Sequence, residues 1–206
     1  MEVLGLGLIV VAVIYLLSRI SYGTDNNTSV CDNAWLTGGE IVGPVEAVNN
    51  KINGVMKDEK QKLGTKDLFL CTLTEMKCQY EIDEDDDERI VFGYQGEVFQ
   101  ADVSNDNPYV WIRDLFWMSI DQDDIDEMAR LRRVINEANM NTAVTTVYTL
   151  WDDDKTFNVH SKSSFIFLPQ HPNLVEFLRV ELDAFFHAKQ FIQIEMEKLR
   201  QKEGVE

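Results

Sequence analysis

The chain has 206 residues, with 19 Lys or Arg against 36 Asp or Glu and a formal net charge of −17. With 45% hydrophobic residues it can bury a core, which excludes a disordered polymer. The charge excludes sequence-independent binding of nucleic acid, because phosphate neutralisation needs clustered cations. It also argues against docking on anionic lipid through a basic face. We expect one domain with an N-terminal extension.

The chain begins with an apolar run over residues 3–17 that is followed by Arg19. The run is shorter than the roughly 20 residues of a membrane-spanning helix, although further apolar residues extend it at the interface. We expect residues 1–22 to form a retained single-pass anchor that meets the membrane through residues 3–20. A cleaved signal peptide and a buried core helix are the alternatives.

The basic residue next to this apolar run is Arg19. The positive-inside rule therefore places the main domain, which follows Arg19, in the cytoplasm. The cysteines agree with that placement. Cys31, Cys71 and Cys78 lack metal-binding spacing. Cys71 and Cys78 lie seven apart in a predicted helix, roughly 10 Å along its axis, which is too far for a disulfide between them. We therefore expect buried thiols in a reducing compartment.

Residues 23–63 are predicted to form a polar linker followed by a short amphipathic helix over 44–63. A regular domain is expected over 64–206. It begins with a helix that Thr65 is expected to cap. The apolar positions of this helix recur at steps of three and four. These positions are Phe69, Leu73, Met76 and Tyr80. Seven acids in residues 81–88 then indicate a solvated turn.

The rest of this domain alternates strands and helices. Strands over 89–94, 97–103 and 109–117 predict an antiparallel meander. A helix capped by Asp121 should bury one stripe and leave its arginines outside. The stripe is Ile125, Met128, Leu131, Ile135 and Ala138, and the arginines are Arg130, Arg132 and Arg133. Strands over 142–151 and 156–167 and a long helix over 172–202 complete the domain.

These elements predict an α+β fold in which an antiparallel five-stranded sheet packs with helices in the order αβββαββα, preceded by an N-terminal hydrophobic helix. Over residues 64–202 this order of elements resembles the YbjN-like family. The features that carry the resemblance are the Phe92–Phe99 hairpin, the 135–139 helix end, the 144–159 hairpin and the Leu- and Phe-rich last helix. That bacterial family is labelled a sensory transduction regulator, and its fold is similar to type III secretion chaperones. The resemblance implies a non-enzymatic protein-binding or regulatory module and brings no catalytic residues.

Reactive chemistry has little support in the sequence. The acidic stretches fail the EF-hand pattern, and His160, His171 and His187 have no catalytic or metal-binding spacing. We expect no catalytic residue, no metal, no cofactor and no enzymatic activity, and we interpret the histidines as structural. Asn136 and Asn139 are interpreted as caps of a helix C-terminus.

Two features indicate binding to a protein. If helices cover one face of the sheet, some of Trp111, Trp151 and Phe157 can line the other face and bind a partner segment. The last helix carries a nearly heptad seam that includes Ile192, Met196 and Leu199 and is interrupted by Lys189. Beyond Lys189 we expect it to pack on a second copy, giving a homodimer, or on the 44–63 helix. Packing within the domain alone is the alternative.

Together these features predict a membrane-anchored, cytoplasm-facing, chaperone-like or regulatory adaptor whose protein partner the sequence does not identify. A soluble or exported binding protein with a cleaved signal sequence is the alternative, and a hydrolase is the least supported reading.

Overall fold

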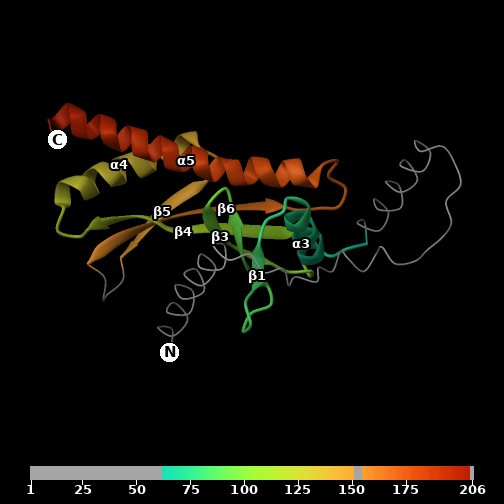
Figure 1. The fold of residues 1–206 in the computed structure, drawn as a ribbon. Coiled ribbons are helices and arrows are strands. Elements are labelled where there is room, and N and C mark those ends of the chain that lie inside the picture. Colours follow the sequence, from blue (N-terminus) through green and yellow to red (C-terminus); the bar gives the residue numbers. More distant parts are fainter. Residues whose placement is uncertain (1–61, 151–154, 205–206) are drawn as a thin grey trace, which may run out of the picture. The chain divides into compact units, whose positions relative to one another are not determined.

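The computed structural model describes residues 62–150 and 155–204 (Figure 1). The elements are α3 (Thr65–Glu75), β1 (Tyr80–Ile82), β2 (Arg89–Tyr94), β3 (Glu97–Val103), β4 (Tyr109–Asp121), α4 (Ile125–Asn141), β5 (Thr145–Leu150), β6 (Thr156–Ile166) and α5 (Leu174–Glu203). The predicted anchor, residues 23–61 of the predicted linker and amphipathic helix, and Trp151 lie outside the described residues, and residues 62 and 63 form a turn. Within them, no helix is long and apolar enough to cross a membrane.

The strands form one antiparallel sheet of six strands in the order β1-β2-β3-β4-β6-β5, so the α+β class is confirmed and the predicted five strands are one too few. The additional strand is β1, whose first residue was predicted as the end of the first helix and whose other two residues were predicted as part of the acidic turn. That helix ends at Glu75, and Lys77 reverses the chain with a φ of 60°. Tyr80 still packs on the same apolar core as Met76, but does so from a strand.

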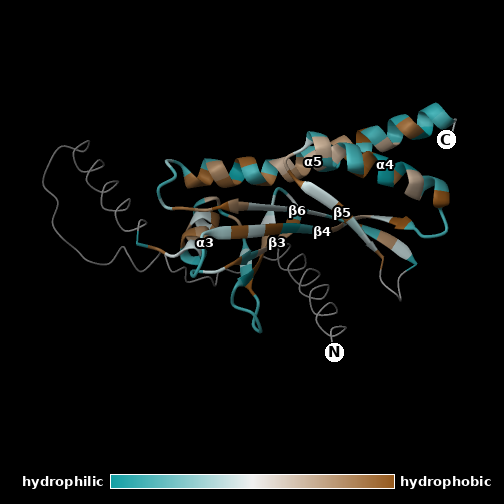
Figure 2. Cartoon of the chain, turned by 180° about the vertical axis from the view of Figure 1, so that it is seen from behind, coloured by the Kyte–Doolittle hydropathy of each residue, from teal (hydrophilic) through white to brown (hydrophobic). Residues whose placement is uncertain are grey.

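All three described helices pack on the same face of the sheet, which we call the inner face. Figure 1 shows α4 and α5 together on one side of the strands, and α3 joins α5 in one apolar cluster with β2, β3 and β4. A second cluster lies between α4, the distal half of α5 and the ends of β4 and β6. In Figure 2, α5 alternates between hydrophobic and hydrophilic colours, as expected for a helix with one buried side.

The helix α4 differs from its prediction at its start and in its buried stripe. Its N-cap is Asp124, whose side chain accepts a hydrogen bond from the backbone N–H of Glu127, whereas Asp121 ends β4. Met128, Leu131, Ile135 and Ala138 are buried as predicted. The predicted burial of Ile125 is wrong, because this side chain is exposed in the first turn. The predicted exposure of Arg130 is also wrong, because this side chain is buried.

Beyond Lys189, α5 packs against α4 of its own domain. Ile192 and Met196 are buried in the second cluster, and Leu199 packs against it. The described contacts of these three residues therefore follow the intramolecular alternative. The homodimer stays untested.

The start of α3 is capped by a side chain distant in sequence, and the predicted cap Thr65 is instead its first residue. Oδ1 of Asn105 accepts hydrogen bonds from the backbone N–H groups of Lys66 (2.9 Å) and Asp67 (3.3 Å). Gly64 makes room for it, since a Cβ at Gly64 would lie 2.3 Å from that oxygen. Asn105 therefore ties the β3–β4 turn to α3.

We expect Asn105→Ala to lower the free energy of unfolding by about 1 kcal/mol, because two helix N–H groups lose their acceptor. Gly64→Ala should have a similar effect by displacing the same side chain. Urea unfolding measures both. If the two act through one cap, the double variant should lose much less than the sum; full additivity would contradict the shared cap.

Candidate functional site

A buried ion pair joins β4 to α5 at the point where the two apolar clusters meet. Asp114 is 2% exposed, and its Oδ2 lies 2.7 Å from Nζ of Lys189. Glu97 adds a second carboxylate 3.1 Å from the same ammonium, which also lies 5.7 Å from the centre of the Trp117 ring. Sequence reasoning missed the pair, although a charge at an inward strand position and a Lys in an apolar helix seam were both visible.

The pair lies beside an irregularity in β4. Between Asp114 and Met118 the pairing with β6 shifts, and Phe116 adopts a φ of 56°. The Phe116 N–H donates to Nδ1 of His160, and the two rings contact edge to face. Non-Gly residues rarely adopt this conformation, so the surrounding contacts must hold it in place.

Polar contacts continue from the bulge across the inner face. The indole N–H of Trp117 donates to Oγ of Ser161, which lies 3.1 Å from the hydroxyl of Thr146. Asn139 then accepts the backbone N–H of Thr146 and donates to its carbonyl oxygen. The predicted capping role of Asn139 is therefore wrong: its amide pairs with the backbone of β5, where that edge of the sheet has no further strand among the described residues.

Burial raises the pKa of Asp114 to about 6 from an ordinary 3.8, with Lys189 opposing the rise and Glu97 adding to it. An acid with such a pKa can exchange protons near neutral pH. Asp114 is nevertheless enclosed by its strand neighbours and Lys189, so a substrate could not contact its oxygens in this structure. Its geometry suits a structural charge that positions α5.

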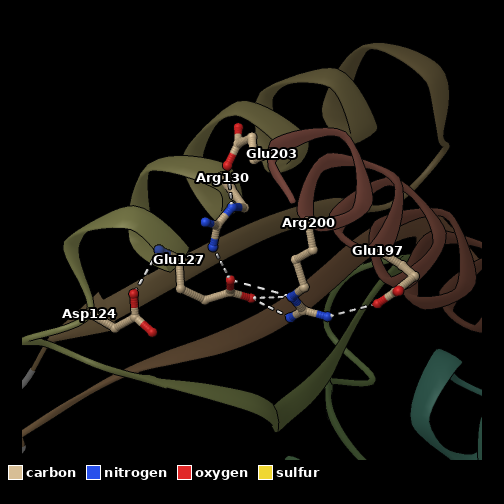
Figure 3. A network of polar contacts seen from close by, with 6 residues as sticks. All are labelled: Asp124, Glu127, Arg130, Glu197, Arg200 and Glu203. Carbon is tan, nitrogen blue, oxygen red and sulfur yellow. Dashed lines mark hydrogen bonds and ion pairs between the residues drawn. The ribbon is translucent and has the colours of Figure 1, made fainter. Parts of the chain in front are cut away.

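A second polar network joins the ends of α4 and α5 (Figure 3). Glu127 accepts hydrogen bonds from Arg130 (2.6 Å) and Arg200, and Arg130 also donates to Glu203 at 2.7 Å. Arg200, and secondarily Arg130, lower the pKa of Glu127 against the effect of burial. The network explains why Arg130 turns inward, contrary to its prediction.

The opposite face of the sheet, which we call the outer face, exposes a group of large apolar side chains. Tyr109 and Trp111 on β4 and Ile166 on β6 are 48%, 47% and 50% exposed. Tyr109 lies directly opposite Ile166 in the strand register, and Trp111 lies opposite Ser164. We call Tyr109, Trp111 and Ile166 the outer patch.

Charged residues border the outer patch. Arg113 follows Trp111 on the same face and lies directly opposite Lys162 of β6. Asp102 of β3 lies opposite Trp111 and pairs with Arg113. The outer face thus combines an apolar, aromatic centre with a polar border, the arrangement common in protein interfaces.

The structure separates the predicted partner-binding residues. Trp111 lies on the outer face as expected, but Phe157 packs into the second cluster on the inner face, edge to face with Tyr148. Ile192 and Met196 are enclosed by the domain itself. Among the predicted partner-binding residues that the structure describes, Trp111 has a large apolar side chain that is exposed and that a partner could contact.

The predicted chemistry of the thiols is partly wrong. Cys71 is disulfide-bonded, whereas Cys78 is a free thiol that follows α3 and whose pKa burial raises. The two do not share a helix, because α3 ends before Cys78.

The acidic turn is bonded locally to cations. Arg89 pairs with Asp83 and Asp86, and Lys66 pairs with Asp87. Among residues 62–150 and 155–204, no group of His, Cys, Asp and Glu is arranged to hold a metal ion.

Two solved structures are similar to this chain. One is an uncharacterized protein from Methanothermobacter thermautotrophicus, with 13% identity, a TM-score of 0.44, and coverage of 65% of this chain and 97% of that one. The other is YbjN from E. coli, a candidate transcription regulator, with 11% identity, a TM-score of 0.42, and coverage of 66% and 92%. No protein-family model and no curated protein matches the sequence. The second of these structures is a YbjN protein, the family that the sequence resembles in its order of elements.

The raised pKa of Asp114 predicts a pH-dependent stability. Because the folded state holds this proton more tightly than the unfolded chain, the group's stabilising contribution is complete below pH 3.8 and is lost as pH rises through about 6. Between pH 4 and 7 the wild type should lose up to about 3 kcal/mol relative to Asp114→Asn. Urea unfolding at a series of pH values measures the difference.

Glu137→Gln removes an exposed acid from α4 and serves as the control, which should follow the wild-type profile. If Asp114→Asn followed it as well, the buried carboxyl would not be the titrating group.

Proposed function

We propose that this chain is a non-enzymatic protein-binding module and that its outer patch is the binding surface. The observation that supports this function is the exposure of Tyr109, Trp111 and Ile166 side by side on a face that no described helix covers. Aromatic side chains are enriched where interfaces are most fully buried, and Trp and Tyr dominate the residues whose loss weakens binding most.

The fold supports this division between its faces. The phenylalanines of the first cluster lie between the sheet and the helices, where Phe69 contacts both Phe92 and Phe167. The stability of the domain therefore rests on the inner face, and Trp111 adds apolar surface that the described packing does not use. A partner that covered it would gain the free energy of removing that surface from water.

We further propose the chaperone-like or regulatory adaptor role, with residues 1–22 as its membrane anchor on the basis of the apolar run. The cytoplasmic placement stays a prediction from Arg19. The disulfide of Cys71 instead favours an oxidising compartment for the domain, because disulfides persist mainly in such compartments.

We expect Trp111→Ser to abolish capture of a stoichiometric partner by the tagged full chain from native membranes, while the free energy of unfolding changes by less than about 1 kcal/mol. Quantitative mass spectrometry of the captured proteins measures the loss. Ile194→Ser is the matched control, because it removes a similarly exposed apolar side chain from α5.

Equal loss of capture in both variants would point to a general effect of surface polarity. Unfolding of Trp111→Ser would place Trp111 in the core. Either result would contradict the proposed binding surface.

The compartment can be tested through the thiols. If the domain lies in an oxidising compartment, Cys71 should resist alkylation when the protein is denatured without reduction directly from cells, and Cys78 should react. Peptide mapping after differential labelling measures both. Full alkylation of Cys71 without reduction would support the cytoplasmic placement.

A further inference from the structure

The outer patch is bordered by two cations that face each other across neighbouring strands. Arg113 of β4 and Lys162 of β6 are register partners, and both lie on the outer face, because Arg113 alternates with the inward residues Ile112 and Asp114. Side chains in such pairs are roughly 5 Å apart at Cβ, and like charges placed directly opposite each other destabilise a sheet.

The two cations differ in how they are neutralised. Arg113 pairs with Asp102 on its β3 side. Lys162 is exposed, and within the described ranges 62–150 and 155–204 it makes no ion pair. Its other register partner is the uncharged Thr145 of β5. A surplus positive charge therefore borders Trp111 on a chain whose net charge is −17.

From this arrangement we propose that the partner segment is acidic as well as apolar and places a carboxylate between Arg113 and Lys162. This inference rests on the proposed function and specifies the chemistry of its partner. A carboxylate there would relieve the repulsion between the two cations and would make charge-assisted hydrogen bonds.

The spacing along β4 defines the pattern that such a segment needs. Tyr109, Trp111 and Arg113 lie on one face at intervals of two residues, about 6.7 Å each. An extended segment matches them when apolar, apolar and acidic side chains follow one another at alternate positions.

The net charge of the protein opposes an acidic partner, but at longer range. At physiological salt, interactions between exposed charges are largely screened beyond about 8 Å. Arg113 and Lys162 would touch the carboxylate directly, at distances where screening is weak. Local pairing therefore outweighs the general repulsion once the apolar contacts hold the segment in place.

The test uses two fluorescently labelled synthetic peptides and the full chain in nanodiscs made of zwitterionic lipid. Both peptides alternate Phe, Leu and one charged residue with Ser, and the charged residue is Glu in one and Lys in the other. Fluorescence anisotropy should show that the Glu peptide binds at least about tenfold more tightly than the Lys peptide. Lys162→Glu should reverse this order, and Lys162→Gln should remove most of the difference.

Lys202→Glu is the matched control, because it makes the same change in net charge at an exposed position of α5. It should leave the ratio of the two affinities within about twofold of wild type. An equal effect of Lys162→Glu and Lys202→Glu would show that net charge, and not the Arg113–Lys162 pair, selects the peptide, and would overturn the inference.

The other outcomes separate this inference from the proposed function. If Trp111→Ser abolishes partner capture but the Glu peptide binds no better than the Lys peptide, the binding surface stands and an acidic partner is overturned. If Trp111→Ser leaves capture intact, the proposed surface fails whichever peptide binds. Co-sedimentation of the full chain with anionic vesicles that depends on Trp111, without preference for the Glu peptide, would assign the face to lipid and overturn the inference.

Discussion

The contact between Asp114 and Lys189 fixes how the long helix lies on the sheet. In both β4 and α5, the residues before this pair belong to the first apolar cluster and those after it to the second. A helix of 30 residues with apolar side chains along its length could otherwise pack at several positions. Sliding α5 by one turn would leave both charges buried without a partner, at a cost of several kcal/mol. The pair therefore specifies one position of the helix, whether or not it adds net stability.

That position determines what each face of the sheet can do. When Lys189 of α5 contacts Asp114, the first half of α5 packs with α3 and the second half packs with α4. All three helices therefore cover the inner face. The Glu127–Arg200 contact holds the far ends of α4 and α5 together. On the outer face no described helix covers Trp111 and its neighbours, and a surface that does not support the fold can change to suit a partner.

Much of the architecture was predictable because it depends on local pattern. The hairpin of β2 and β3, the long last helix after Pro172 and the apolar side of α4 all follow from periodicity and turn residues. The first helix was overextended because Tyr80 continues its apolar spacing, and spacing alone does not register the left-handed turn at Lys77. Asn139 was misread because its partner, the backbone of Thr146, comes close only after β5 folds back against α4.

The sequence by itself determined the α+β class and most helices and strands, because hydrophobic period and turn chemistry act within a few residues. It also singled out Trp111 as a candidate partner-binding residue. Only the tertiary structure decided which face of each strand the helices cover, and so separated Trp111 from Phe157. The tertiary structure also places Asp114 in contact with Lys189, which lies 75 residues later in the sequence, and Arg113 opposite Lys162. Such pairs depend on strand register and helix docking, which are set by the packing of the whole core.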